Sequence, residues 1–203
     1  WGDDHGLEID QFAIDRIEVT KGPAALLYGS DAIGGVISLY DNYIPTAKFQ
    51  GSASLFMRSN NESVGLSARL QGAGNHFYWK ANGTFIDYAD YKVPTGSIQY
   101  YSYDIPLHNH RLRNTAGFER DGSMTFGYRS HNFHTELKLS DAYSKSGFFA
   151  NAHGLEVRLS DIDYDRSRRD IDLPYQSVNH LRVMSHTVYE QGSLALEADL
   201  AYQ

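Results

Sequence analysis

The sequence has 203 residues, with 18 lysines and arginines against 25 aspartates and glutamates, a net charge of −7 and no cysteine. These counts indicate one domain or slightly more, exclude a disulfide framework and a cysteine-ligated metal centre, and leave no basic excess for a nucleic-acid partner. No run of about 20 apolar residues occurs, so no membrane-spanning helix is predicted, although transmembrane β-strands are only half apolar and escape that test.

The two ends of the sequence bear on whether it is a complete protein. The sequence begins at Trp1, without an initiator methionine or a signal peptide. At the other end, residues 194–203 alternate apolar and polar side chains, and no turn residues follow them. We therefore expect the chain to be a piece of a longer protein.

Residues 14–40 predict a strand, a short helix, a glycine turn and a second strand. Residues 14–19 alternate apolar and charged side chains, as a half-buried strand does. Pro23 suits the first position of a helix, and Gly29 suits the cap that ends it. The glycines of this segment match neither the dinucleotide-binding nor the P-loop spacing, so phosphate binding is not indicated.

The segment IDRIEVTKGPAALLYGSDAIGGVISL, residues 14–39, resembles the end of the plug domain of TonB-dependent outer-membrane transporters. The resemblance rests on the elements RIEV-KGP, LYGS and IGGVI. It implies a mainly β fold in two parts. Residues 1–45 would be the C-terminal part of an α+β plug domain. Residues 46–203 would be the first strands, about 7 of 22, of a transmembrane antiparallel β-barrel, truncated in strand 7.

The rest of the sequence has the period of two that spanning strands require. Val64, Leu66 and Leu70, for example, alternate with small or polar residues. A soluble β-sandwich would show the same alternation, but the connection lengths favour a barrel, because every second connection is short and both long connections fall on the opposite side. The predicted strands are residues 48–58, 62–71, 76–88, 118–130, 133–146, 177–189 and 193–203.

The resemblance also implies roles for individual plug residues. Arg16 and Glu18 share one face of the first predicted strand and would form a latch of charge contacts with the barrel wall. The alternative is a solvated charged face. The residues that shape the plug backbone are Gly22, Pro23, Gly29, Gly34 and Gly35.

Ligand contact is expected at the plug apex and in the two long outer loops. The apex candidates have aromatic, acidic or imidazole side chains: Trp1, Asp3, Asp4 and His5. The loop candidates are aromatic residues and histidines: Tyr100, Tyr101, His108, His110, Phe149 and His153. An H-x-H pair on a strand directs both imidazoles the same way, which is a start for metal or haem ligation. The alternative is that these side chains do not contact ligand.

The resemblance implies an active importer of a scarce nutrient in the outer membrane of a Gram-negative bacterium. Its partners would be TonB, through a TonB box absent from this sequence, outer-membrane lipid and a small-molecule ligand. The stretches RLRNTAGFERDGSMTFGYRS, FFANAHG and DLPYQSVNHLRV resemble family members associated with iron chelates. We therefore expect an iron–siderophore complex or haem as substrate, ahead of zinc and cobalamin.

No catalytic group, resident metal or cofactor is predicted. The sequence has no G-x-S-x-G nucleophile motif, and its Asp161-x-Asp163-x-Asp165 stretch lacks the glycine and the final glutamate of a calcium loop. We therefore do not expect an enzyme. Two other classes stay open: a soluble β-rich ligand-binding module and a passive porin. Neither needs the plug motif.

Overall fold

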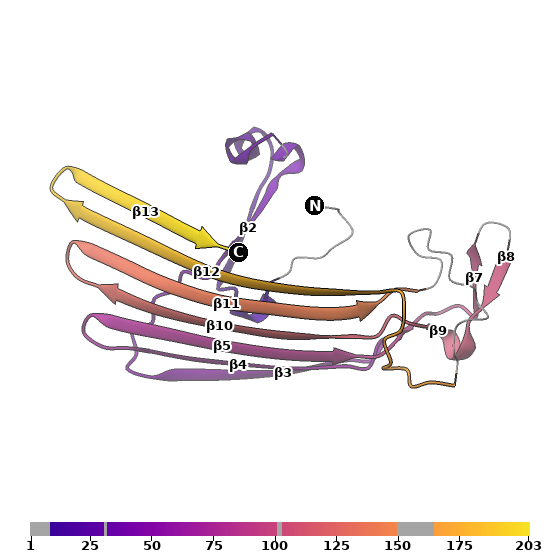
Figure 1. Cartoon of the computed structure of the whole chain (residues 1–203). Helices are drawn as coiled ribbons and strands as arrows, with labels where there is room; N and C mark the ends of the chain where they lie inside the picture. The colour runs from indigo at the N-terminus through magenta and orange to yellow at the C-terminus, as the bar shows by residue number, and fades with distance from the viewer. Residues whose placement is uncertain (1–8, 31, 101–102, 150–164) are drawn as a thin grey trace.

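The computed structural model describes residues 9–30, 32–100, 103–149 and 165–203, and most of them lie in one large curved sheet (Figure 1). This sheet has seven antiparallel strands, and three further sheets have two strands each. Within the described residues, the helical segments are short 3-10 turns, and none is long and apolar enough to cross a membrane. The prediction of a mainly β chain is confirmed.

Each strand of the large sheet pairs with its neighbour in sequence, which gives the order β13-β12-β11-β10-β5-β4-β3. The sheet is open, and β3 and β13 form its edges. The seven strands correspond to the seven predicted ones. Their bounds are β3 (Gln50–Arg58), β4 (Ser63–Ala73), β5 (Phe77–Tyr88), β10 (Gly117–Arg129), β11 (Phe133–Gly147), β12 (Tyr175–Gln191) and β13 (Leu194–Tyr202).

The connections between these strands differ at the two ends of the sheet, as predicted. At one end, β4–β5, β10–β11 and β12–β13 are joined by tight turns. At the other end lie the two long connections, beside the β3–β4 turn (Figure 1). The first long connection contains four short strands and a 3-10 turn: β6 (Tyr91–Lys92), β7 (Ser97–Tyr100), β8 (Tyr103–Pro106), η4 (His108–His110) and β9 (Arg111–Leu112).

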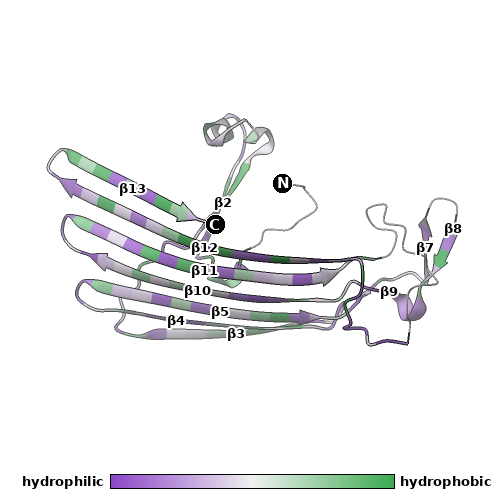
Figure 2. Ribbon diagram, in the orientation of Figure 1, coloured by the Kyte–Doolittle hydropathy of each residue, from purple (hydrophilic) through white to green (hydrophobic). Residues whose placement is uncertain are grey.

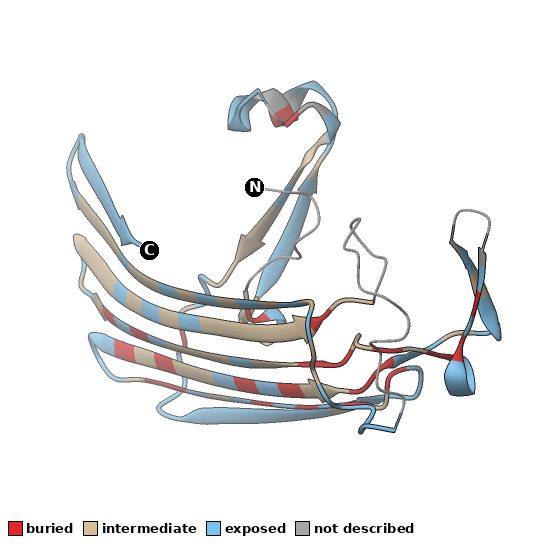
Figure 3. Cartoon of the chain, turned by 45° about the vertical axis from the view of Figure 1, so that its right-hand side comes forward, coloured by how far each residue is buried: buried red, intermediate tan, exposed pale blue. Residues whose placement is uncertain are grey.

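The first described residues form a separate hairpin above one face of the large sheet (Figures 1 and 3). Its elements are η1 (Gln11–Ala13), β1 (Arg16–Thr20), η2 (Pro23–Tyr28), η3 (Ala32–Gly34) and β2 (Val36–Tyr40). Gly35 adopts φ +129°, and a Cβ there would lie 2.8 Å from the Thr20 carbonyl oxygen. A glycine is therefore required where the chain turns into β2. Gly22 and Gly29 also have positive φ, whereas Gly34 does not.

The two faces of the large sheet have opposite chemistry, visible as alternating bands along the strands (Figures 2 and 3). On β4, Leu66 is 54% exposed, whereas Ser67 beside it is 5% exposed. The exposed apolar side chains continue across the sheet at Phe85, Met124, Phe126, Leu137, Leu139 and Leu181. A soluble protein buries its apolar face and exposes its polar one. This sheet does the reverse, and its apolar face therefore requires an apolar surrounding.

Candidate functional site

The N-terminal segment, residues 9–45, contacts the polar face of the large sheet through three aspartates. The first of them is Asp10. Thr84 Oγ1 lies 2.9 Å from Asp10 Oδ2 and 2.8 Å from Ser67 Oγ, and Asn82 Nδ2 donates to the same carboxylate oxygen of Asp10. The other Asp10 oxygen accepts a hydrogen bond from the Phe12 main-chain N–H and caps η1. One buried carboxylate therefore both starts the 3-10 turn and holds it on β5.

Asp15 makes the second contact, with Arg69 on β4. Arg69 Nη1 donates to Asp15 Oδ1 at 2.5 Å, and Arg69 Nη2 donates to the Phe12 carbonyl oxygen at 2.9 Å. The Phe12 ring stacks on Phe56 of β3, which occupies the space above Gly65. Arg69 thus binds a carboxylate and a main-chain carbonyl of the same segment, a geometry that suits the fork of a guanidinium group.

Asp41 makes the third contact and bridges two lysines of the sheet. Lys80 Nζ of β5 donates to Asp41 Oδ1 at 2.8 Å and to the Asp41 carbonyl oxygen at 2.9 Å, and Lys138 Nζ of β11 donates to Oδ2. Burial raises the pKa of the Asp41 carboxyl, but hydrogen bonds to Lys138 and Lys80 and their positive charges outweigh burial, so the pKa lies below its ordinary value. The ionised form therefore prevails.

The three aspartates attach the segment to three strands by charged or carboxylate hydrogen bonds. Such bonds are stronger than neutral ones, yet they can break and re-form without loss of covalent structure. Sequence reasoning did not single out these residues. The available signal was that Arg69, Lys80 and Lys138 occupy the polar positions of strands that alternate with apolar ones.

Arg16 and Glu18, the predicted latch, lie on β1 and pair with each other. Their side chains are 2.8 Å apart and about half exposed, and the Arg16 guanidinium lies 4.4 Å from the Tyr40 ring centroid. In the described residues, the ion pair of Arg16 is therefore within its own strand. A latch formed by Arg16 and Glu18 with the barrel wall stays a prediction.

A second polar cluster holds together the loops at the far end of the sheet. Asp90 is fully buried; it accepts a hydrogen bond from Arg113 Nη1 at 2.6 Å and two from the main-chain N–H groups of Thr115 and Ala116. Glu62, in the β3–β4 turn, pairs with three cations: Lys92, Arg111 and Arg168. These contacts join the two long connections to each other and to the turn.

A hollow of about 440 Å³ opens beside this cluster. Five arginines contribute to its lining: Arg111, Arg113, Arg166, Arg168 and Arg169. Arginine side chains in such number suit a ligand with carboxylate or phosphate groups. His108 also lines this hollow.

The H-x-H pair in the first long connection does not have the strand geometry that would direct both imidazoles the same way. His108 and His110 lie in the 3-10 turn η4, and Asn109 and His110 have positive φ, so the two imidazoles are not related by strand alternation. His110 Nδ1 instead lies 2.9 Å from the Thr95 carbonyl oxygen.

The structure describes few of the other predicted ligand residues. The backbone of Tyr100 ends β7, and Phe149 is half-buried after β11. The remaining candidates lie outside the described residues: Trp1, Asp3, Asp4, His5, Tyr101 and His153. Their contact with a ligand stays a prediction.

Comparison with known proteins identifies the segment that lies on the sheet. Residues 2–36 match the family described as TonB-dependent Receptor Plug Domain. The Vitamin B12 transporter BtuB of Vibrio vulnificus (strain YJ016) is 64% identical over 31 residues, which are 15% of this chain and 5% of that protein. The Iron-regulated outer membrane virulence protein of Vibrio cholerae (strain O395) is 70% identical over 27 residues, 13% of this chain and 4% of that protein.

These matches confirm the recognition of the plug segment and agree with the expectation that the chain is not an enzyme. The aligned stretches span about a twentieth of the length of these relatives, and the match to the plug family ends before the large sheet begins.

Proposed function

We propose that this chain is part of a TonB-dependent active transporter of the outer membrane. Residues 1–45 would be the end of its plug and residues 46–203 the first strands of its barrel wall. One observation carries the proposal: a segment of plug-family sequence is bound through Asp10 and Asp15, and the residues that follow it through Asp41, to the polar face of a sheet whose opposite face is apolar and exposed. Lipid would surround the apolar face, and the polar face would line the lumen.

The two other classes account for less of the structure. A soluble β-rich module has no use for an exposed apolar sheet face, which would drive its aggregation. A passive porin needs an unobstructed lumen and has no reason to bind a segment of plug sequence across its wall. A gated importer needs both a lipid-facing wall and a plug that closes it.

The contacts between the segment and the sheet suit a plug that must move. Asp41 with its two lysines, and Asp15 with Arg69, hold the closed position at ordinary pH. Work done through TonB on the N-terminal side would have to break these ion pairs, and their re-formation would restore the closed position. The energy source and the contact with TonB are part of the proposal.

The proposed substrate is an iron–siderophore complex or haem. The name of the iron-regulated relative and the arginine-lined hollow among the loops support an anionic iron chelate. The match to a vitamin B12 transporter supports cobalamin as the second candidate. The family match lies in the plug, and the loops where ligand selection is expected are outside it.

A growth assay tests this function with the full-length gene that contains this chain. A deletion strain would receive the gene and would be supplied with a ferric siderophore, haem or cyanocobalamin as the only source of iron or cobalamin. We expect growth on an iron source that requires TonB. Rescue only by cyanocobalamin would refute the proposed substrate, and rescue that persists without TonB would refute the active transporter.

A further inference from the structure

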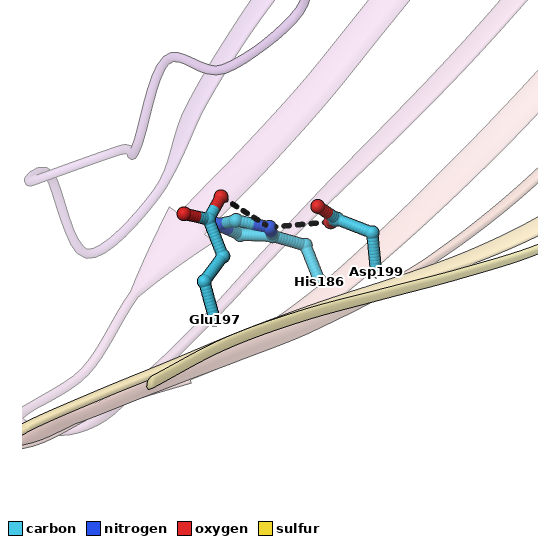
Figure 4. A group of neighbouring side chains, drawn as sticks. All are labelled: His186, Glu197 and Asp199. Carbon is cyan, nitrogen blue, oxygen red and sulfur yellow. Dashed lines mark hydrogen bonds and ion pairs between the residues drawn. The ribbon is translucent and has the colours of Figure 1, made fainter. Parts of the chain in front are cut away.

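We propose that His186, Glu197 and Asp199 bind one divalent transition-metal ion on the polar face of β12 and β13 (Figure 4). His186 and Glu197 lie in the half of their strands that is closer to the tight turn, and Asp199 lies one residue past the middle of β13. Sequence analysis predicted no metal site there. The site is separate from the arginine-lined hollow at the other end of the sheet, and its function does not depend on the identity of the transported nutrient.

Strand register places these three side chains together. His186 and Asp199 are directly opposite partners in the β12–β13 pair, and Glu197 lies two residues from Asp199 on the same face. Opposite residues in an antiparallel pair have Cβ atoms about 4.5–5.5 Å apart, and the diagonal neighbour is within reach of a long side chain. The pairing of the two strands therefore assembles the site without any loop.

The distances among the donor atoms suit a small metal ion. His186 Nδ1 lies 2.7 Å from Asp199 Oδ1 and 3.9 Å from Glu197 Oε1, and a donor atom of each residue lies within 4.8 Å of the others. A tetrahedral ion with bonds of about 2.1 Å separates its ligand atoms by about 3.4 Å. The observed separations lie on both sides of that value, so small side-chain rotations would complete the coordination.

The negative charges of Glu197 and Asp199 also favour a bound cation. Two carboxylates share this face, and in the part of the chain that the structure describes their ion-pair partner is the same imidazole, that of His186. One imidazolium neutralises at most one carboxylate, whereas a divalent ion neutralises both. On the other side of His186, its β11 register partner is Glu136, which adds a third carboxylate to the surroundings.

Polar side chains of β11 and β5 lie beside these three residues. Tyr78 donates from its hydroxyl to Glu136 Oε2 at 2.7 Å, and the same hydroxyl lies 2.8 Å from His134 Nε2. The His134 and His186 rings are 6.0 Å apart. One nitrogen and two carboxylate oxygens are a donor set for Zn²⁺, Co²⁺ or Mn²⁺ rather than for a soft metal that prefers sulfur.

Cobalt binding to the full chain in detergent micelles tests the site. Co²⁺ would be added to the wild type, H186Q and D199N, with His180→Gln as the control because His180 lies on the same strand and shares the face of His186. We expect the wild type to give a visible d–d absorption that saturates at one ion per chain and is lost on addition of Zn²⁺. H186Q and D199N should each weaken binding at least about tenfold, whereas H180Q should not.

The folding of each variant would be checked by far-UV circular dichroism. If H186Q or D199N fails to fold, E197Q on the edge strand replaces it. Absence of the cobalt absorption in the wild type would overturn the proposal. Equal weakening by H180Q and H186Q, or unchanged binding in both ligand variants, would overturn it as well.

Discussion

Replacing Asp41 by asparagine tests whether its carboxylate holds the N-terminal segment, residues 9–45, on the sheet. The asparagine would keep the size of the side chain but would leave Lys80, which is 8% exposed, without a negative partner. Removing one partner of a buried ion pair costs about 3–5 kcal/mol. We expect about 2–4 kcal/mol here, because Lys80 keeps the carbonyl oxygen of residue 41 and the Lys138 side chain is 24% exposed.

A thiol introduced at Thr125 reports this change. Thr125 is 3% exposed and is the register partner of both Lys80 and Lys138, so it lies in the sheet between the two lysines that Asp41 bridges. The chain has no cysteine, and T125C therefore labels at one position. If the segment must lift before the thiol reacts, D41N should raise the labelling rate about 30- to 900-fold.

The control is Glu18→Gln in the same segment. Glu18 pairs with Arg16 in an exposed position, where an ion pair contributes at most about 1 kcal/mol. Its labelling rate should rise less than about fivefold. Equal labelling rates in T125C, T125C/D41N and T125C/E18Q would show that Asp41 does not hold the segment, and the reasoning would be wrong.

Three further predictions follow from the same structure. The folded-state pKa of Asp41 lies below its ordinary value of 3.8, so its ion pairs stabilise the segment fully above pH 3.8, and this stabilisation is lost as the pH falls through the folded-state pKa. Hydrogen exchange in residues 36–45, corrected for the intrinsic rate, should accelerate over that pH range in the wild type and should show no such pH step in D41N. Gly35→Ala should destabilise the β1–β2 hairpin by about 1–3 kcal/mol, because its φ of +129° and its contact with the Thr20 carbonyl exclude a Cβ; Gly34→Ala, where a Cβ would meet no atom within 4 Å, is the control, and equal hydrogen-exchange protection of β1 in both variants would contradict the explanation. Leu137→Arg on the exposed apolar face should destabilise the folded chain in lipid vesicles by up to about 2–4 kcal/mol, whereas Leu137→Ile should not, and vesicle insertion unaffected by the arginine would argue against a lipid-facing wall.

The strands of the large sheet were predictable because each depends on local information. A period of two in apolar residues and the turn residues between the runs, with the family resemblance for the strand at residues 118–130, placed the seven strands to within a few residues. The loop geometry at the H-x-H pair was not predictable in this way, because the positive φ of Asn109 and His110 places the pair in a 3-10 turn where alternation does not apply.

The contacts between the N-terminal segment and the large sheet depend on residues far apart in the sequence. Asp41 and Lys138 are 97 positions apart, and Asp15 and Arg69 are 54 apart. Each of these residues, taken alone, reads as an ordinary charged side chain in a strand or loop. Arg16 and Glu18 drew attention because they lie within the plug motif, whereas the neighbouring Asp15 is the residue that contacts the large sheet.

The amino-acid sequence by itself determined the plug segment, the alternation that makes one sheet face apolar and the other polar, and the end of the sheet where the long connections lie. These properties follow from the order of side chains along single strands and turns. Only the tertiary structure decided which charges meet: the curved sheet brings Lys80 and Lys138 to one aspartate, and the β12–β13 register sets His186 opposite Asp199. The physical reason is that ion pairs and metal ligands depend on distances of a few ångströms between strands, which no local pattern specifies.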